Sequence, residues 1–246
     1  MVLIPLVAGI VVTTRGTTIE ASDVVVLITL SLAWVTGFFF FHAAGRYLST
    51  RLRPRYRRAV FTYAAISAAL TATTIALKPL LLAWALVFLP LMTVALLCAW
   101  RGYERSLTAR IATITAAAMI VPVCASTRCE ALTCFVSDLR PWIVTALLGA
   151  YFATTVPYVK TLIRHRDSTT WLVGSIVAHV VVFVGVAALA TFAIISPWHI
   201  VVWTVVLVRA VAFPISQQQR GRRWSPRVIG LTEMVLSFLV FITALR

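Results

Sequence analysis

The chain has 246 residues, of which 61% are apolar and only 12% are charged, and its mean hydropathy is +0.97. Soluble domains carry charge on roughly a quarter of their residues, so this composition excludes a water-soluble protein and predicts an all-α, polytopic transmembrane helical bundle in which residues 1–246 form a single membrane domain. The net charge of +15 would suggest nucleic acid in a soluble protein, but here we interpret it as a topology signal that also attracts anionic lipid, and we expect no nucleic-acid partner.

Nine apolar segments follow one another along the chain. The first, MVLIPLVAGIVVTT, has no basic start and no cleavage site, so it does not resemble a removable signal peptide. About a dozen residues are too few to cross a bilayer, so we expect a short or truncated first span. The other eight spans are expected at residues 23–41, 59–77, 80–100, 111–125, 142–159, 171–195, 198–213 and 228–245.

Basic residues are concentrated in every second connection between the apolar segments. Most Lys and Arg residues fall in residues 42–58, 100–110, 160–167 and 209–227, which are every second connection. The other connections hold most of the acids: Glu20, Asp23, Glu130 and Asp138. Because basic loops stay in the cytoplasm, we expect nine spans in the inner (plasma) membrane, with the N-terminus inside and the C-terminus outside.

Three cysteines lie in one of the outer connections, five residues apart: Cys124, Cys129 and Cys134. A disulfide between two of them is expected in an oxidising compartment, although the sequence does not select the pair. No His is nearby, and three ligands would leave a zinc site open, so we expect no metal site.

The segment YFATTVPYVKTLIRHRD, residues 151–167, begins as an apolar helix and ends in a cluster of cations. Lys160 and Arg164 are four residues apart and share one helix face. We interpret this end as one wall of an anion-accepting site at the cytoplasmic surface.

Ionisable side chains also occur inside the apolar segments. Glu233 and His179 lie about two turns into their spans, Arg209 lies near the inner end of the eighth, and His42 and Arg46 close the second. Such residues are costly in a membrane and usually face a partner or a cavity.

Two interpretations of these buried groups remain open. In the first, Glu233 pairs with Arg209 and His179 bonds a backbone carbonyl, so that they only hold the bundle together. In the second, Glu233 and His179 lie deep in a polar cavity that opens to the cytoplasm, with cations at its mouth.

Catalytic motifs are missing. The chain has no pair of Asp-rich motifs for magnesium and a diphosphate, no Gly-rich phosphate loop, no GxSxG and no HExxH. We therefore assign no catalytic residue, expect no cofactor and leave open whether the protein is an enzyme.

Four segments, RLRPRYRRAVFTY, RGYERSL, YVKTLIRHR and RVIGLTEMVLS, occur in this order. With them the chain resembles the YwiC-like family of bacterial integral membrane proteins over nearly its whole length. The resemblance implies a membrane architecture but no activity, and it points to Tyr103, Glu104, Arg105, Tyr158, Lys160, Thr161, Ile163, Arg164 and Glu233. Family members typically open with a His-Gly-Ala-Trp type segment. Because this chain starts at MVLIP, either the natural start lies upstream or part of the site is missing.

A looser similarity in topology is to membrane prenyltransferases of the UbiA type. These enzymes also have nine spans and important cytoplasmic loops after the second and sixth. Their loops carry aspartates where this chain carries cations, so the similarity implies that Arg and Lys would hold a diphosphate directly.

Three functions follow from these features. The first is a protein that binds or moves a small anionic or amphipathic molecule in a cationic, cytoplasm-facing pocket. The alternatives are a UbiA-like enzyme acting on an isoprenoid, that is a lipid-tailed diphosphate or quinone precursor, and a scaffold whose basic loops recruit an acidic partner. The candidate ligand-binding residues are His42, Arg46, Tyr103, Glu104, Arg105, Tyr158, Lys160, Arg164, His179, Arg209 and Glu233.

Overall fold

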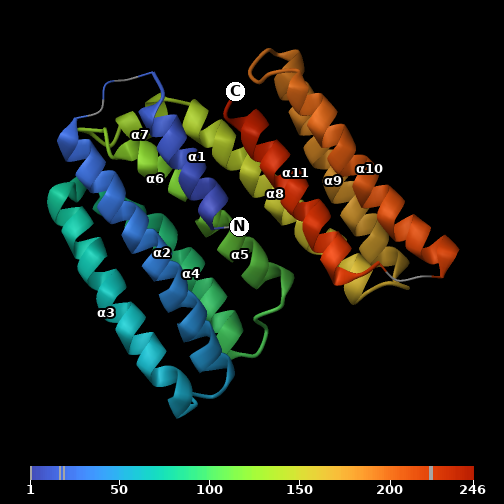
Figure 1. Ribbon diagram of the computed structural model, residues 1–246, viewed down its shortest axis with the longest axis horizontal. Helices are drawn as coiled ribbons and strands as arrows, with labels where there is room; N and C mark the ends of the chain where they lie inside the picture. The colour runs from blue at the N-terminus through green and yellow to red at the C-terminus, as the bar shows by residue number, and fades with distance from the viewer. Residues whose placement is uncertain (1, 17, 19, 222–223) are drawn as a thin grey trace. The chain divides into compact units, whose positions relative to one another are not determined.

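The apolar segments of the chain form helices. The computed structural model describes residues 2–16, 18, 20–221 and 224–246, and each regular element in this part of the chain is helical (Figure 1). The elements are α1 (Leu3–Thr14), α2 (Ala21–Ser49), α3 (Pro54–Leu77), the 3-10 helix η1 (Pro79–Trp84), α4 (Ala85–Trp100), α5 (Leu107–Ala118), α6 (Ile120–Ser126), α7 (Cys134–Ser137), α8 (Arg140–Ile163), α9 (Thr169–Thr191), α10 (Trp198–Arg220) and α11 (Pro226–Ala244).

Eight helical segments are long and apolar enough to cross a bilayer. Each overlaps one of the eight expected spans, with η1 and α4 forming one segment, Pro79–Trp100, and α5 and α6 another, Leu107–Ser126. The first apolar segment forms α1, a shorter helix of 12 residues. The expected bundle of membrane helices is thus confirmed, and the protein is a multi-pass membrane protein.

Local sequence signals set several helix ends. Ser106, Ser168 and Ser225 each precede a helix, and each side chain accepts a hydrogen bond from a backbone N–H in the first turn. At the end of α10, Gly221 has a φ of +61°, a left-handed conformation that glycine adopts without steric strain.

Most spans extend beyond their predicted apolar segments, but α9 ends at Thr191, before the predicted end at residue 195. We expected the eighth span to end at residue 213, but α10 continues through Pro214 to Arg220. Arg209 therefore lies midway along α10, and the prediction that it lies near the inner end of this span was wrong. A proline removes only one donor from the hydrogen-bond ladder, and Gly221 supplies the actual stop. Arg222 and Arg223, also counted in this basic connection, lie outside the described residues.

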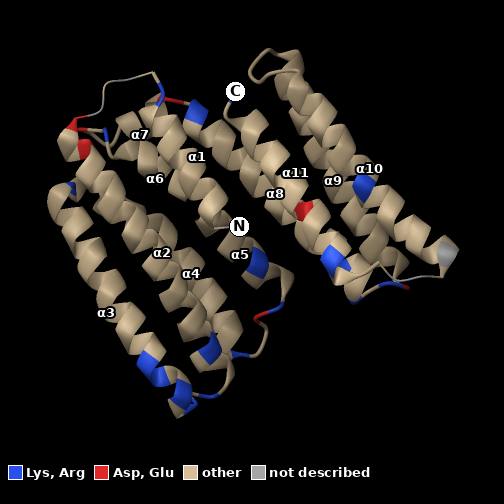
Figure 2. Ribbon diagram, viewed as in Figure 1, with Lys and Arg blue, Asp and Glu red and all other residues tan. Residues whose placement is uncertain are grey.

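The chain divides into two compact units, residues 1–146 and residues 147–246, called unit 1 and unit 2 below. In unit 1, α1 packs on α6, and α2 packs on α3 and α4. Lys and Arg residues gather at the α2–α3 and α4–α5 connections, at one end of this unit (Figure 2). Unit 2 contains the rest of α8 together with α9, α10 and α11.

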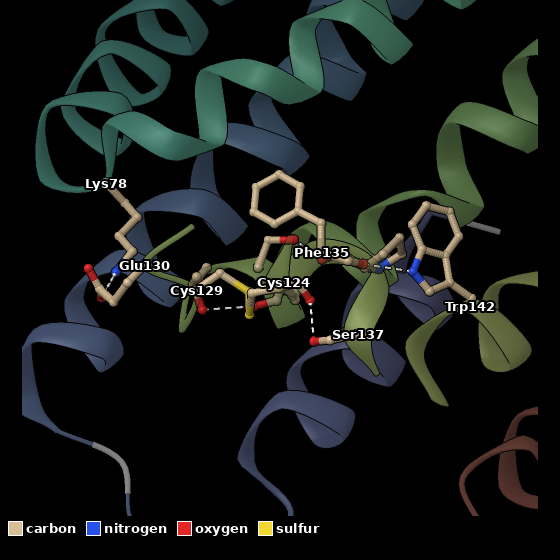
Figure 3. Close-up of a disulfide and its surroundings, with 11 residues drawn as sticks. Lys78, Cys124, Cys129, Glu130, Phe135, Ser137 and Trp142 are labelled. Atoms are coloured by element: carbon tan, nitrogen blue, oxygen red, sulfur yellow. Dashed lines mark hydrogen bonds and ion pairs between the residues drawn. A yellow bond between two sulfur atoms is a disulfide. The ribbon is translucent and has the colours of Figure 1, made fainter. Parts of the chain in front are cut away.

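The connection between α6 and α8 in unit 1 contains the expected disulfide. It joins Cys129 to Cys134, while Cys124 is a buried free thiol (Figure 3). Lys78 Nζ forms an ion pair with Glu130 at 2.6 Å, which ties this connection to the end of α3. Within the described part of the chain, no three His, Cys, Asp or Glu side chains are grouped so that they could hold a metal ion.

Counting thiols tests the disulfide pairing. The unfolded, unreduced protein should take up two alkylating groups, on Cys98 and Cys124, and the reduced protein should take up four. Mass spectrometry reads both numbers, and the Cys124→Ser variant should give one and three. Alkylation at Cys129 without reductant would contradict the pairing. Because the bond closes a short loop, its reduction should lower the free energy of unfolding by about 2 kcal/mol.

Candidate functional site

Polar side chains from all four helices of unit 2 meet inside the unit. We call this set the polar cluster, and it consists of Tyr151, Thr155 and Tyr158 on α8, Ser175 and His179 on α9, Arg209 on α10, and Glu233 on α11. Arg209, at its centre, is only 4% exposed. A charge buried inside a membrane helix must be paired, and the cluster shows how this is achieved.

Arg209 forms an ion pair with Glu233. Its Nη1 donates to Glu233 Oε1. The other carboxylate oxygen, Oε2, accepts from the hydroxyl groups of Tyr151, at 3.1 Å, and Thr155, at 3.2 Å. The carboxylate is therefore held from α10 on one side and from α8 on the other, and the charges of the pair cancel.

His179 links Arg209 to the backbone of α9. Its Nδ1 lies 2.7 Å from the carbonyl oxygen of Ser175, and its Nε2 lies 3.2 Å from Arg209 Nη2. A carbonyl oxygen can only accept and a guanidinium can only donate, so Nδ1 carries the proton and Nε2 accepts. The contacts thus fit the neutral imidazole. If Nε2 were protonated, it would place an N–H donor opposite the N–H donor of Arg209 Nη2, and no hydrogen bond could form between them.

Tyr158 covers the guanidinium of Arg209. The Arg209 Cζ atom lies 4.0 Å from the centre of the Tyr158 ring, which is a cation–π contact. The same ring meets the imidazole of His179 edge-on, with centroids 6.3 Å apart. Tyr158 is fully buried.

Three polar atoms of the cluster lack a hydrogen-bond partner among the described residues. They are Tyr158 Oη, Ser175 Oγ and Arg209 Nε. All three residues contact one another or His179: Tyr158 and Arg209 stack on each other, and the carbonyl of Ser175 bonds His179. Unpaired polar groups are costly in a membrane interior, where no lipid atom can replace the missing bond. The hydrogen bonding of the cluster is therefore incomplete at these three atoms.

Cations and aromatic rings gather where α8 ends. The Nζ atom of Lys160 lies 5.0 Å from the centre of the Trp171 ring, and His165 stacks on this indole at 4.5 Å. Gln217, near the end of α10, donates to the Leu162 carbonyl at 3.4 Å, so the ends of α8 and α10 lie side by side. Arg164, just past the last residue of α8, is exposed. Unit 2 thus has a cationic end.

The predicted site residues separate into two groups. Tyr158, His179, Arg209 and Glu233 are brought together in the polar cluster, and Lys160 and Arg164 lie at the cationic end. The others belong to unit 1: His42 and Arg46 on α2, and Tyr103, Glu104 and Arg105 between α4 and α5. Of these, Glu104 is partly buried, the other four are exposed, and Glu104 pairs with Arg105 at 3.8 Å.

Sequence reasoning missed three members of the cluster: Tyr151, Thr155 and Ser175. Tyr151 and Thr155 hold the Glu233 carboxylate, yet both are uncharged at neutral pH, so the search for charges inside spans passed over them. Helical spacing could have found them, because Tyr151, Thr155 and Tyr158 recur at the intervals that place side chains on one helix face.

Comparison with known proteins decides the family. A family model described as YwiC-like protein matches residues 1–125, about half of the chain. The chain belongs to the YwiC-like family. No curated protein and no solved structure matches the chain, and the looser similarity to UbiA-type prenyltransferases is not confirmed.

The YwiC-like match lies wholly in unit 1. It includes Tyr103, Glu104 and Arg105, but it ends before the segment with Lys160 and before Glu233, which the resemblance had also implied. Membership of the YwiC-like family therefore agrees with the membrane architecture. The polar cluster lies outside the matched residues.

Proposed function

We propose that this membrane protein binds or moves a small anionic or amphipathic molecule through unit 2, with Arg209 as the cation that holds the anionic group. The main support is the set of unpaired, buried atoms around Arg209: Tyr158 Oη, Ser175 Oγ and Arg209 Nε. An oxyanion supplies several acceptor oxygens, which could satisfy these donors together.

In this proposal, Glu233 competes with the ligand. Its carboxylate occupies Arg209 in the free protein, and the anion takes its place. The released carboxylate keeps the hydroxyl groups of Tyr151 and Thr155 as donors. Exchange of one anion for another keeps the buried Arg209 guanidinium paired, while the Glu233 carboxylate loses its cation and retains only its two hydroxyl donors.

We further propose that the ligand enters from the cationic end of unit 2 and that this end faces the cytoplasm of the cell whose inner membrane holds the protein. Two observations support this orientation. The basic connections of unit 1 lie at one end, and the disulfide, which needs an oxidising compartment, lies in a connection of the other set. Four spans, α3, η1–α4, α5–α6 and α8, separate the α2–α3 connection from residues 160–167, so both would lie on the basic side. The exposed Arg51, Arg53 and Arg55 would contact anionic lipid.

The Glu233→Gln variant tests the proposed competition. Gln keeps an acceptor oxygen for Tyr151 and Thr155 but leaves the charge of Arg209 uncompensated. Phosphate, diphosphate and benzoate, added in turn, should therefore raise the unfolding temperature of this variant more than that of the parent protein. An anion at about a hundred times its dissociation constant stabilises the state that binds it by about 2.7 kcal/mol.

Glu130→Gln is the matched control, because Glu130 also pairs with a cation, Lys78, but lies in unit 1. This variant should respond to anions as the parent protein does. Equal responses of the Glu233 and Glu130 variants to every anion of the panel would contradict the proposed competition at Arg209.

A further inference from the structure

Unit 1 contains a cavity of about 480 Å³ between α2, α3, η1, α4, α5 and α6. Its wall is mainly aliphatic and aromatic, with one serine and three threonines, and within the described part of the chain it includes no charged residue. Leu82 and Leu89 line the cavity and are also 58% and 65% exposed, so it opens to the outside of the helices. Both residues belong to the span Pro79–Trp100, so the opening faces lipid hydrocarbon.

Two tryptophans that line the cavity have unused hydrogen-bond donors. The indole N–H groups of Trp34 and Trp84 are buried and have no acceptor among the described residues, and both residues line the cavity. The neighbouring Trp142 differs, because its N–H donates to the Phe135 carbonyl at 2.8 Å. An indole N–H is a donor only, so a ligand that uses it must bring an acceptor. Hydrocarbon chains alone do not supply one.

The volume limits the occupant. At about 30 Å³ for each water-sized group, the cavity holds roughly 16 such groups. That is enough for one ring with part of a tail, or for one chain, and too little for a lipid with two full acyl chains. The absence of charge from the described wall disfavours an ionic head group, because nothing there would pair with it.

We infer that this cavity binds an uncharged lipid with a single ring or a single chain and a carbonyl oxygen, which accepts a hydrogen bond from the indole of Trp34 or Trp84. Entry is from the bilayer, through the opening beside Leu82 and Leu89. This site is independent of the polar cluster, which lies in unit 2.

Tryptophan fluorescence tests the inference on the full chain in detergent. Two probes distinguish the sources of such a carbonyl: a benzoquinone with one alkyl chain, and a monoacylglycerol with a brominated chain. Quinone rings and bromine atoms both quench indole emission on contact. We expect saturable quenching by at least one probe, and a smaller maximal quench in the Trp34→Phe variant.

Filling the cavity should weaken binding. Gly37 lines the cavity, and a Cβ atom at this position would meet only Ser67 Oγ, at 3.6 Å, so Gly37→Leu can be built without a clash at Cβ. It should weaken the binding of the quenching probe at least tenfold. Gly45→Leu is the matched control on the same helix, since a Cβ at Gly45 meets nothing within 4 Å. It should bind as the parent protein does.

The outcomes are decisive in both directions. Non-saturable quenching by both probes, or equal quenching of the Gly37→Leu and Gly45→Leu variants, would overturn the inference. If Gly37→Leu does not fold, Thr71→Leu replaces it, because Thr71 lines the cavity from α3 and is exposed. Loss of quenching in this variant, with retention in Gly45→Leu, supports the cavity as the site.

Discussion

Arg209→Leu is expected to destabilise the protein by about 3 to 5 kcal/mol, which is the usual loss when one partner of a buried ion pair is removed. The carboxylate of Glu233, whose side chain is only 15% exposed, would be left without its cation. His179 Nε2 would lose its donor, and the ring of Tyr158 would lose its cation–π partner. Denaturant titration of the purified protein measures the change in the free energy of unfolding.

A double variant separates loss of the pair from loss of one partner. In Arg209→Leu/Glu233→Gln no uncompensated charge remains, and Gln still accepts from Tyr151 and Thr155. Most of the stability lost in the single variant should therefore return, because a buried ion pair is often replaced by neutral residues at little cost. If the double variant were as unstable as Arg209→Leu alone, the unpaired carboxylate of Glu233 would not be the cause of the lost stability.

The second large effect is expected at Gly9, where α1 meets α6. A Cβ atom at this position would lie 2.9 Å from Cys124 Sγ and 3.1 Å from the backbone Cα of Val121. Backbone cannot move aside as a flexible side chain can, so a larger residue must separate the two helices. Gly9→Leu should lower the free energy of unfolding by about 3 kcal/mol, the upper part of the range for overpacked cores.

Gly45→Leu again provides the comparison, because it places the same side chain on a membrane helix in open space. Its free energy of unfolding should change by less than about 1 kcal/mol, mainly through helix propensity. If Gly9→Leu were equally mild, α1 would not be packed on α6 as described. The short first helix would then contribute little to the folded bundle.

The sequence predicted the spans well because one physical property decides them. A run of about 20 apolar residues has few stable states other than a membrane helix. Helix ends were predicted less well where polar residues continue the helix. In α2 and α10, helical backbone continues beyond the apolar run to Ser49 and Arg220. Apolar composition marks the membrane-buried part of a helix, whereas glycines and caps mark its end.

The candidate site was predicted in part. Buried ionisable residues were recognised by their cost, and two predicted contacts are confirmed: Glu233 pairs with Arg209, and His179 bonds the Ser175 carbonyl. The two unused indoles of unit 1 could not be foreseen, because a tryptophan in a span gives no sign of whether its N–H has an acceptor. That depends on packing between helices far apart in the sequence.

The most direct test of the proposed function compares anion binding by two variants that differ only at Arg209. Glu233→Gln retains the guanidinium, and Arg209→Leu/Glu233→Gln lacks it, while neither carries a carboxylate at position 233. We expect phosphate, diphosphate or benzoate to raise the unfolding temperature of the first and to leave that of the second unchanged. Equal stabilisation of both variants would contradict Arg209 as the cation that holds the ligand.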